Sequence, residues 1–219
     1  MKATLALLTV LTLLFCTTLG SPAKADTVLF QDNFNAENGG SGALNYTGFS
    51  GWKIDRGTVD LIGNGFFDFY PGNGLYVDLD GSTSAAGKME TKTGFDLFAA
   101  DTYQLDFDLG GSTRGDTNSV AVSLDGMYGE LFVLPSAAPL THYTRIINPF
   151  GNTSGATLTF DHAGGDNLGL ILDNVKLTKL DNSKPNDCPP VTPEPASCAT
   201  MLFGGGIPLL GYLKRRFLG

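Results

Sequence analysis

Aromatic, carboxylate and amide side chains are concentrated in one stretch, Thr58–Gly81, of this 219-residue chain. Sugar recognition uses flat aromatic faces against the C–H groups of a pyranose ring, and Asp, Asn or Gln side chains for its hydroxyls. This stretch, together with the single tryptophan shortly before it, supplies both kinds of group. We predict that the sugar-binding residues are Trp52, Asp68, Tyr70, Asn73 and Tyr76.

The same stretch also allows a purely structural interpretation. Phe66, Phe67 and Trp52 belong to residue types that are most often part of a protein core. Pro71–Gly74, with the sequence Pro-Gly-Asn-Gly, has the composition of a turn. The sequence by itself leaves both interpretations open.

Catalytic motifs are sparse in this chain. Its two histidines, His142 and His162, accompany neither a Gly-x-Ser-x-Gly nor a His-Glu-x-x-His motif. A glycosidase needs two carboxylates at a fixed separation, and 22 acidic residues neither identify nor exclude such a pair. We therefore expect a protein that is not an enzyme. The alternatives are a secreted polysaccharide hydrolase or lyase, and a purely structural matrix protein.

A two-residue period runs through the segments that must position these groups. In Thr102–Leu109 and Ser119–Asp125 apolar residues alternate with polar ones, which is the pattern of a half-buried strand. Similar short segments, separated by Gly, Asn, Asp and Ser, are Thr27–Phe34, Thr58–Ile62, Gly74–Asp80, Gly87–Thr93, Leu131–Leu134, His142–Ile147, Ala156–Phe160 and Leu168–Leu177. The pattern predicts an all-β fold, an antiparallel β-sandwich of the jelly-roll type with about ten strands.

The last of these segments changes its register internally. Its apolar residues share one parity up to Leu172 and the opposite parity from Val175 onward. A β-bulge at Asp173-Asn174 is the simplest cause, because one extra residue in a strand reverses the side-chain alternation. We therefore predict a bulge that turns the Asp173 carboxylate away from its regular direction.

The two ends of the predicted sandwich resemble a known family. A first strand ending in Gln31-Asp32-Asn33-Phe34 and a last strand with Leu172-Asp173-Asn174-Val175 look like the opening and closing strands of galactose-binding-like jelly rolls, the fold of many carbohydrate-binding modules. The resemblance implies that the terminal strands pair and that acidic residues near them hold a structural calcium ion.

The resemblance carries the calcium ligands over to Asp32 and Asp173, with the Asn33 and Asn174 side chains as further oxygen ligands. The alternative is that these Asp and Asn side chains only form hydrogen bonds with turns and strand ends. Both possibilities stay open here.

Charge excludes several classes of partner. Residues 26–187 contain 21 Asp or Glu and 9 Lys or Arg, a net charge of −12. Nucleic acid and anionic lipid surfaces need a basic binding surface, which this segment lacks. An acidic surface is compatible with cations, with solubility outside the cell and with neutral sugars.

The start of the chain has the features of a secretory signal peptide. Met1 and Lys2 are followed by the apolar run Leu5–Phe15 and then by Ala23-Lys24-Ala25. Small residues at Ala23 and Ala25 match the signal-peptidase rule, so we expect cleavage after Ala25 and removal of residues 1–25. An uncleaved membrane helix is the alternative.

The last 27 residues have the order of a membrane-targeting segment. Pro193, Glu194 and Pro195 precede an uncharged apolar stretch, 196–213, and Lys214, Arg215 and Arg216 follow it. Eighteen residues of helix span about 27 Å, which is enough to cross a hydrocarbon core. We predict a single transmembrane helix over 196–213, with the basic cluster on the cytoplasmic side.

This combination is similar to the PEP-CTERM sorting signal of Gram-negative bacteria that make exopolysaccharide. The resemblance implies recognition by an exosortase, cleavage near the Pro-Glu-Pro motif, and delivery to the cell surface or extracellular matrix. A plain C-terminal membrane anchor is the alternative, but it leaves the Pro-Glu-Pro motif unexplained.

Together these features predict four parts: the signal peptide, a β-sandwich domain over 26–180, a Pro-rich linker over 181–192 and the sorting signal over 193–219. We expect an exported, non-catalytic cell-surface or matrix protein that binds carbohydrate. Its predicted partners are signal peptidase and exosortase during export, while it is tethered to the inner membrane, and then the extracellular polysaccharide of a biofilm.

Overall fold

The computed structural model describes residues 25–182 of the chain. The predicted signal peptide, apart from Ala25, and the predicted sorting signal and membrane helix lie outside these residues, and so does the linker beyond Asn182. Over the range 25–182 no helix has the length and apolar character needed to cross a membrane.

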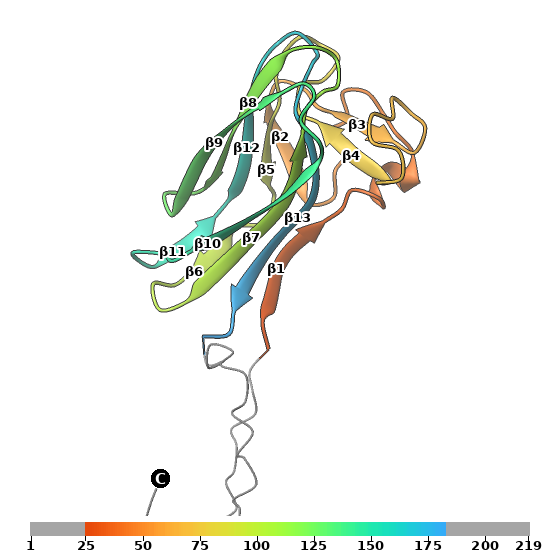
Figure 1. Ribbon diagram of the computed structural model, residues 1–219. Helices are drawn as coiled ribbons and strands as arrows, with labels where there is room; N and C mark the ends of the chain where they lie inside the picture. The colour runs from red at the N-terminus through yellow and green to blue at the C-terminus, as the bar shows by residue number, and fades with distance from the viewer. Residues whose placement is uncertain (1–24, 183–219) are drawn as a thin grey trace, which may run out of the picture. The chain divides into compact units, whose positions relative to one another are not determined.

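The described residues form thirteen strands and one short 3-10 helix (Figure 1). The elements are β1 Thr27–Asp32, η1 Glu37–Gly40, β2 Trp52–Arg56, β3 Asp60–Gly63, β4 Leu75–Asp78, β5 Lys88–Thr91, β6 Phe95–Leu97, β7 Thr102–Gly110, β8 Thr117–Leu124, β9 Tyr128–Pro135, β10 Thr141–Ile147, β11 Thr153–Ala156, β12 Leu158–Ala163 and β13 Ile171–Leu180. The all-β prediction is confirmed, but the expected number of about ten strands is too low. The three strands that were not predicted are β2, β6 and β11, which have five, three and four residues.

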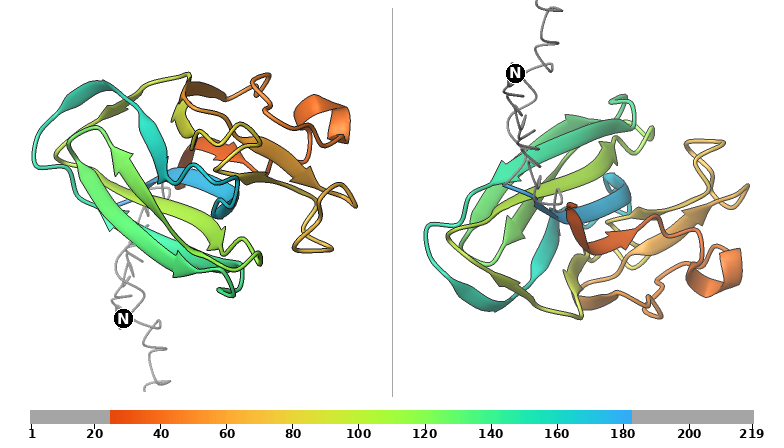
Figure 2. Two further views of the ribbon diagram at one scale, coloured as in Figure 1. Left: turned by 90° about the horizontal axis from the view of Figure 1, so that it is seen from above. Right: turned by 90° about the horizontal axis from the view of Figure 1, so that it is seen from below.

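Two antiparallel sheets make the sandwich. We call them sheet A, with the order β10-β7-β13-β4-β3 and β1 beside β13, and sheet B, with the order β2-β5-β12-β8-β9. Strands β6 and β11 pair separately. The chain crosses repeatedly from one sheet to the other, as in a jelly roll. Figure 2 shows the early strands (orange to yellow) on one side of the sandwich and the middle strands (green) on the other.

The core lies between the sheets because one face of each strand is apolar. The apolar residues that the sequence assigned to one face of β7 and of β8 are fully buried in a single cluster, which includes Leu105, Phe107, Val120 and Val122. Burying a side chain of this size stabilises a fold by about 1.5–3 kcal/mol. The alternate residues point away from this core and form the two outer faces.

The predicted bulge in the last strand is confirmed. The register between β13 and β7 shifts between Asp173 and Lys176, and Asn174 has a φ of +50°. Before the bulge β13 pairs with β4, and after it Val175–Lys179 pair with β1. The bulge therefore lies where two different strands meet the same edge of β13, and the expected pairing of the terminal strands is also confirmed.

Residues 25–182 have what a folding unit needs. All strand pairings given above and both apolar clusters lie within them. About 155 residues is an ordinary size for an independent domain. We therefore use this segment, the sandwich domain, in the experiments below.

Candidate functional site

The predicted sugar-binding residues are divided between two places. Asp68, Tyr70 and Asn73 lie in the loop between β3 and β4, next to Tyr76 on β4. This loop, residues 64–74, covers part of the outer face of sheet A. There Phe69 and Tyr70 pack on a small buried cluster made by Ile62, Tyr76 and Ile171.

Hydrogen bonds within the loop and to neighbouring segments use most of these polar groups. The Tyr76 hydroxyl donates to Asp68 Oδ1 (2.8 Å) and accepts from the backbone N–H groups of Phe69 (2.5 Å) and Tyr70 (2.9 Å). Burial raises the pKa of Tyr76, so its hydroxyl keeps the proton that it donates. The Tyr70 hydroxyl bonds the carbonyls of Gly111 and Ala138, each at 2.8 Å. These contacts stiffen the loop.

We expect Tyr76→Phe to lower the free energy of unfolding by about 1–3 kcal/mol, because two N–H groups and a carboxylate lose a buried partner. Urea unfolding measures this, and hydrogen exchange at Phe69 and Tyr70 should become faster. The matched control is Tyr143→Phe, since the Tyr143 hydroxyl bonds no residue in the described range. Equal stability of the two variants would contradict the role given to the Tyr76 hydroxyl.

Trp52 lies apart from this loop, on β2 of sheet B, and its side chain is fully buried. Its ring contacts Phe30 edge-on, with a distance of 5.0 Å between ring centroids, and its Nε1 donates to Asp32 Oδ2 (2.9 Å). A buried ring presents no face to a ligand in solution. Trp52 and the equally buried Tyr76 therefore take no part in the binding surfaces considered below.

The loop exposes two other rings instead. Phe67 is 56% exposed and Phe66 37% exposed, and their rings meet edge to face with centroids 4.9 Å apart. Phe67 has a φ of +46°, a backbone conformation that costs a bulky residue about 1–3 kcal/mol. Hydrophobicity alone favours a core position for both residues. The Gly63-Asn64-Gly65 run before them was the one sequence signal for an exposed turn.

The predicted calcium ligands come close to one another at the bulge. Asp32, Asn33 and Asn174 line a cavity of about 480 Å³. Both Asp32 carboxylate oxygens already accept hydrogen bonds, from the Phe34 N–H (2.8 Å) and from Trp52. Asp173 is 1% exposed; its Oδ1 accepts from the Asn174 N–H (2.7 Å), and its buried Oδ2 has no partner within the described range.

Burial raises the pKa of Asp173 to about 7, and the negative charges of Asp108 and Asp32 add to this effect. Among residues 25–182 no group of three His, Cys, Asp or Glu side chains is arranged to hold a metal ion. Asp173 thus offers one unpartnered oxygen, while both oxygens of Asp32 are already occupied. Calcium binding at Asp32 and Asp173 stays a prediction.

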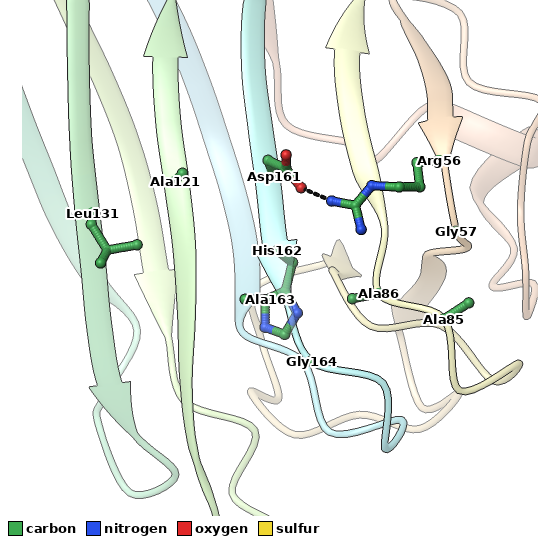
Figure 3. Close-up of a pocket in the computed structure, with 10 residues that line it drawn as sticks. All are labelled: Arg56, Gly57, Ala85, Ala86, Ala121, Leu131, Asp161, His162, Ala163 and Gly164. Atoms are coloured by element: carbon green, nitrogen blue, oxygen red, sulfur yellow. Dashed lines mark hydrogen bonds and ion pairs between the residues drawn. The ribbon is translucent and has the colours of Figure 1, made fainter.

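The outer face of sheet B carries an open depression, which we call the sheet-B groove (Figure 3). Its volume is about 670 Å³. Leu131 on β9 borders it on one side and Arg56 on β2 on the other, and the small residues Ala121 and Ala163 lie between them. Small residues, which include Ala85, Ala86, Ala121 and Ala163, form much of its lining between the larger Leu131 and Arg56.

The β2 side of this face carries charged side chains in pairs. Lys53 bonds Glu90 (3.0 Å), Lys88 bonds Asp55 (2.9 Å), and Arg56 bonds Asp161. Three cations and three carboxylates cancel one another on a domain that is otherwise strongly acidic. Exposed ion pairs of this kind contribute little to stability, so their groups are free to exchange partners.

The β8 and β9 side of the same face is small and aliphatic. Ser119, Ala121 and Ser123 of β8 alternate with buried core residues, and Leu131 and Val133 of β9 lie beside them. Leu131 is 63% exposed. The outer face of sheet B thus combines a row of hydrogen-bonding groups with an apolar strip.

The two histidines lie in different environments. His162 is buried beneath the groove, where its Nε2 accepts from the Leu170 N–H (3.1 Å), and burial lowers its pKa. His142 lies on the outer face of sheet A, with its Nδ1 2.7 Å from Asp108 Oδ1. The two side chains therefore lie on different sheets and do not combine into one site.

No protein-family model and no curated protein matches this sequence. Among solved structures, the CBM22-1 and GH10 modules of the Clostridium thermocellum endo-1,4-beta-D-xylanase 10B, complexed with xylohexaose, match with a TM-score of 0.44 and 16% identity; the match covers 73% of this chain and 30% of that one. The CBM22-1 xylan-binding domain of Paenibacillus barcinonensis Xyn10C matches with a TM-score of 0.43 and 12% identity over 73% of this chain and 98% of that one.

A third structure, TmCBM61 in complex with beta-1,4-galactotriose, matches with a TM-score of 0.40 and 18% identity over 60% of this chain and 90% of that one. At TM-scores below 0.5 these likenesses assign neither a family nor a function to the chain.

Proposed function

We propose that the sandwich domain binds a neutral polysaccharide in the sheet-B groove, without chemical conversion of the ligand. The observation that carries this proposal is the division of one open face into paired charged groups and an aliphatic strip. A pyranose ring presents hydroxyls at its edge and C–H groups on its faces, so it matches both halves of such a surface. An open depression of about 670 Å³ also has room for more than a single sugar.

The paired charges favour a neutral ligand in particular. Arg56 and Asp161 on one side of the groove offer donors and acceptors that can bridge neighbouring hydroxyls, yet they add no net charge. A polyanion would meet a domain with a large excess of carboxylates and no compensating basic surface. The expected partner is therefore an uncharged extracellular glycan.

The ends of the chain support an exported location for this activity. The signal-peptide features around Ala23 and Ala25, and the Pro193-Glu194-Pro195 segment with its basic cluster, favour export and later release at the cell surface. We propose that the protein is a surface or matrix component of this kind. Mass spectrometry of the protein purified from cells tests both proposed cleavages.

Binding to mixed-linkage β-glucan, xylan and galactomannan tests the groove, with the anionic polymer alginate as comparison. We expect the double variant Leu131→Ser/Asp161→Ala to bind the best of the neutral polymers at least tenfold more weakly, because about 1.4 kcal/mol of contacts is lost. Calorimetry or affinity electrophoresis gives the dissociation constant. No new reducing ends or unsaturated sugars should appear during these measurements.

The matched control is Ile146→Ser/Asp96→Ala, which removes an exposed aliphatic residue and an exposed carboxylate away from the groove. Its affinity should equal that of the unmodified domain. Unchanged affinity of the groove variant for every polymer would refute the groove as the site. Release of sugar products in proportion to the amount of protein would instead establish the hydrolase or lyase alternative.

A further inference from the structure

The exposed pair Phe66 and Phe67 is the part of the surface that the proposed groove leaves unexplained. We call it the Phe66–Phe67 platform. The Phe67 ring is more than half exposed and so contributes little to a core, and Phe67 also adopts a left-handed backbone conformation that is unfavourable for a bulky residue. A strained residue that presents its ring to solvent suggests a binding role, since neither property helps the chain to fold.

The platform is rigid, as a preorganised binding surface should be. Gly63 and Phe66 exchange two backbone hydrogen bonds, of 2.8 and 2.9 Å. The Gly65 N–H donates to Asp68 Oδ2 (3.1 Å), and the other Asp68 oxygen is fixed by Tyr76. Behind the loop the Arg114 guanidinium lies over the Phe69 ring, 4.9 Å from its centroid. A loop that merely connected two strands would not need this bracing.

The chemistry around the platform indicates its ligand. Its exposed neighbour in the chain, Asn64, is uncharged, and the Asp68 carboxylate is engaged within the loop. Residues 61–75 contain no arginine or lysine that would attract a phosphate or a polyanion, and the nearby Arg114 guanidinium is paired with Asp78. Exposed aromatic rings beside an amide side chain suit the C–H groups and the hydroxyls of a neutral sugar.

The loop that carries the platform and the sheet-B groove lie on opposite faces of the sandwich. The loop that carries the platform packs on Ile62, Tyr76 and Ile171, which alternate with the core residues of sheet A and so lie on its outer face. The groove residues Ala121 and Asp161 alternate in the same way with core residues of sheet B. Two sheets about 10 Å apart, with their side chains, therefore lie between the two surfaces.

We propose that the Phe66–Phe67 platform is a second binding site for neutral glycan, and that one monomeric domain thereby cross-links two polysaccharide chains. The inference rests on the proposed function of the sheet-B groove, because that groove is the other half of the link. Two sites on opposite faces of a rigid sandwich cannot both lie along one straight glycan segment. The expected consequence is bridging between separate chains, which a single-site protein cannot perform.

The test uses Phe67→Gly in the sandwich domain, because glycine adopts a φ of +46° without strain and the variant loses only the ring. The matched control is Phe150→Gly, which removes an 83% exposed phenylalanine from a different loop. Calorimetry with hexasaccharides of mixed-linkage β-glucan, xylan and galactomannan gives the number of ligands bound per domain. The aggregation of beads coated with the same polymers measures cross-linking.

We expect the unmodified domain and Phe150→Gly to bind two hexasaccharides and to aggregate the beads. Phe67→Gly and the groove variant Leu131→Ser/Asp161→Ala should each bind one and lose aggregation at least tenfold. A mixture of these two variants should also fail to aggregate the beads, because each molecule keeps only one binding site. Light scattering after size exclusion should show monomers throughout; aggregation that follows a dimer fraction would overturn the proposal.

Unchanged stoichiometry and aggregation in Phe67→Gly would also overturn it and leave the groove as a single site. If the groove variant instead binds normally while Phe67→Gly binds nothing, the proposed groove function fails and cross-linking fails with it. The two failures therefore differ in which variant keeps its binding.

Discussion

Replacement of Trp52 by alanine is expected to lower the free energy of unfolding by about 3–5 kcal/mol, because it empties a large volume in the middle of the core. The Trp52 side chain is fully buried, and its ring contacts Phe30, Phe34 and Phe160. The variant also removes the donor for Asp32 Oδ2, so a partly buried carboxylate loses a partner. Marginal stability makes such a loss large enough to unfold much of the domain.

Urea unfolding of the sandwich domain measures this effect, with two comparison variants. Trp52→Phe keeps an aromatic ring and should lose less stability than Trp52→Ala. Phe150→Ala removes an exposed ring and should change stability by about 0.5 kcal/mol or less. If the Trp52→Ala variant keeps its stability but loses glycan affinity, then the Trp52 ring binds sugar, and its burial in the core is contradicted.

Replacement of Asp173 by asparagine is expected to stabilise the domain at pH 8 and to leave its stability at pH 4 nearly unchanged. The pKa of Asp173 is about 7 in the folded chain against an ordinary value of 3.8. The folded state therefore holds a proton that the unfolded state has released, and stability falls as the pH rises from about 4 to about 7. At most about 4 kcal/mol is lost in this way above pH 7, and the uncharged amide of the variant avoids the loss.

Stability curves of both proteins between pH 4 and pH 9 test this expectation. Asp78, whose pKa burial also raises to about 7, is present in both proteins, so the difference between the curves isolates Asp173. The asparagine amide oxygen can still accept from the Asn174 N–H, which keeps the bulge intact. Parallel curves that never diverge toward high pH would contradict the account of Asp173.

The same pair of proteins also tests the proposed structural calcium. A cation bound to the free Asp173 oxygen would stabilise the original domain in millimolar calcium and not the Asp173→Asn variant, because binding to the folded state alone raises stability. If neither added calcium nor chelator changes the melting temperature of either protein, the calcium proposal is wrong. The pH curves are measured in the presence of chelator, so that the effect of pH is independent of any effect of calcium.

Local sequence patterns were sufficient to predict those features of the fold that depend only on a residue's neighbours in the sequence. The alternation in Thr102–Leu109 predicted which side of β7 faces the core, since successive side chains of a strand point to opposite faces. The reversal of parity after Leu172 predicted the bulge for the same reason. The pairing of the terminal strands followed from a resemblance, not from the pattern.

Burial of individual aromatic residues was not predictable in this way. Trp52 and Phe67 are both large and apolar, yet one is fully buried and the other mostly exposed. Tyr76 looked like a platform because it stands among polar residues, but its hydroxyl became the centre of the loop's hydrogen bonds. Which ring faces water depends on the strand or loop that packs above it, and the sequence does not state this.

The sequence by itself determined an acidic, all-β domain whose strands alternate in polarity, because charge and alternation are properties of single residues and their nearest neighbours. Only the tertiary structure decided which groups meet. The sheet-B groove is made by Arg56, Ala121, Leu131 and Asp161, which come from four different strands and are neighbours only after strand pairing. Register between distant strands brings these side chains together, and it depends on the packing of the whole core.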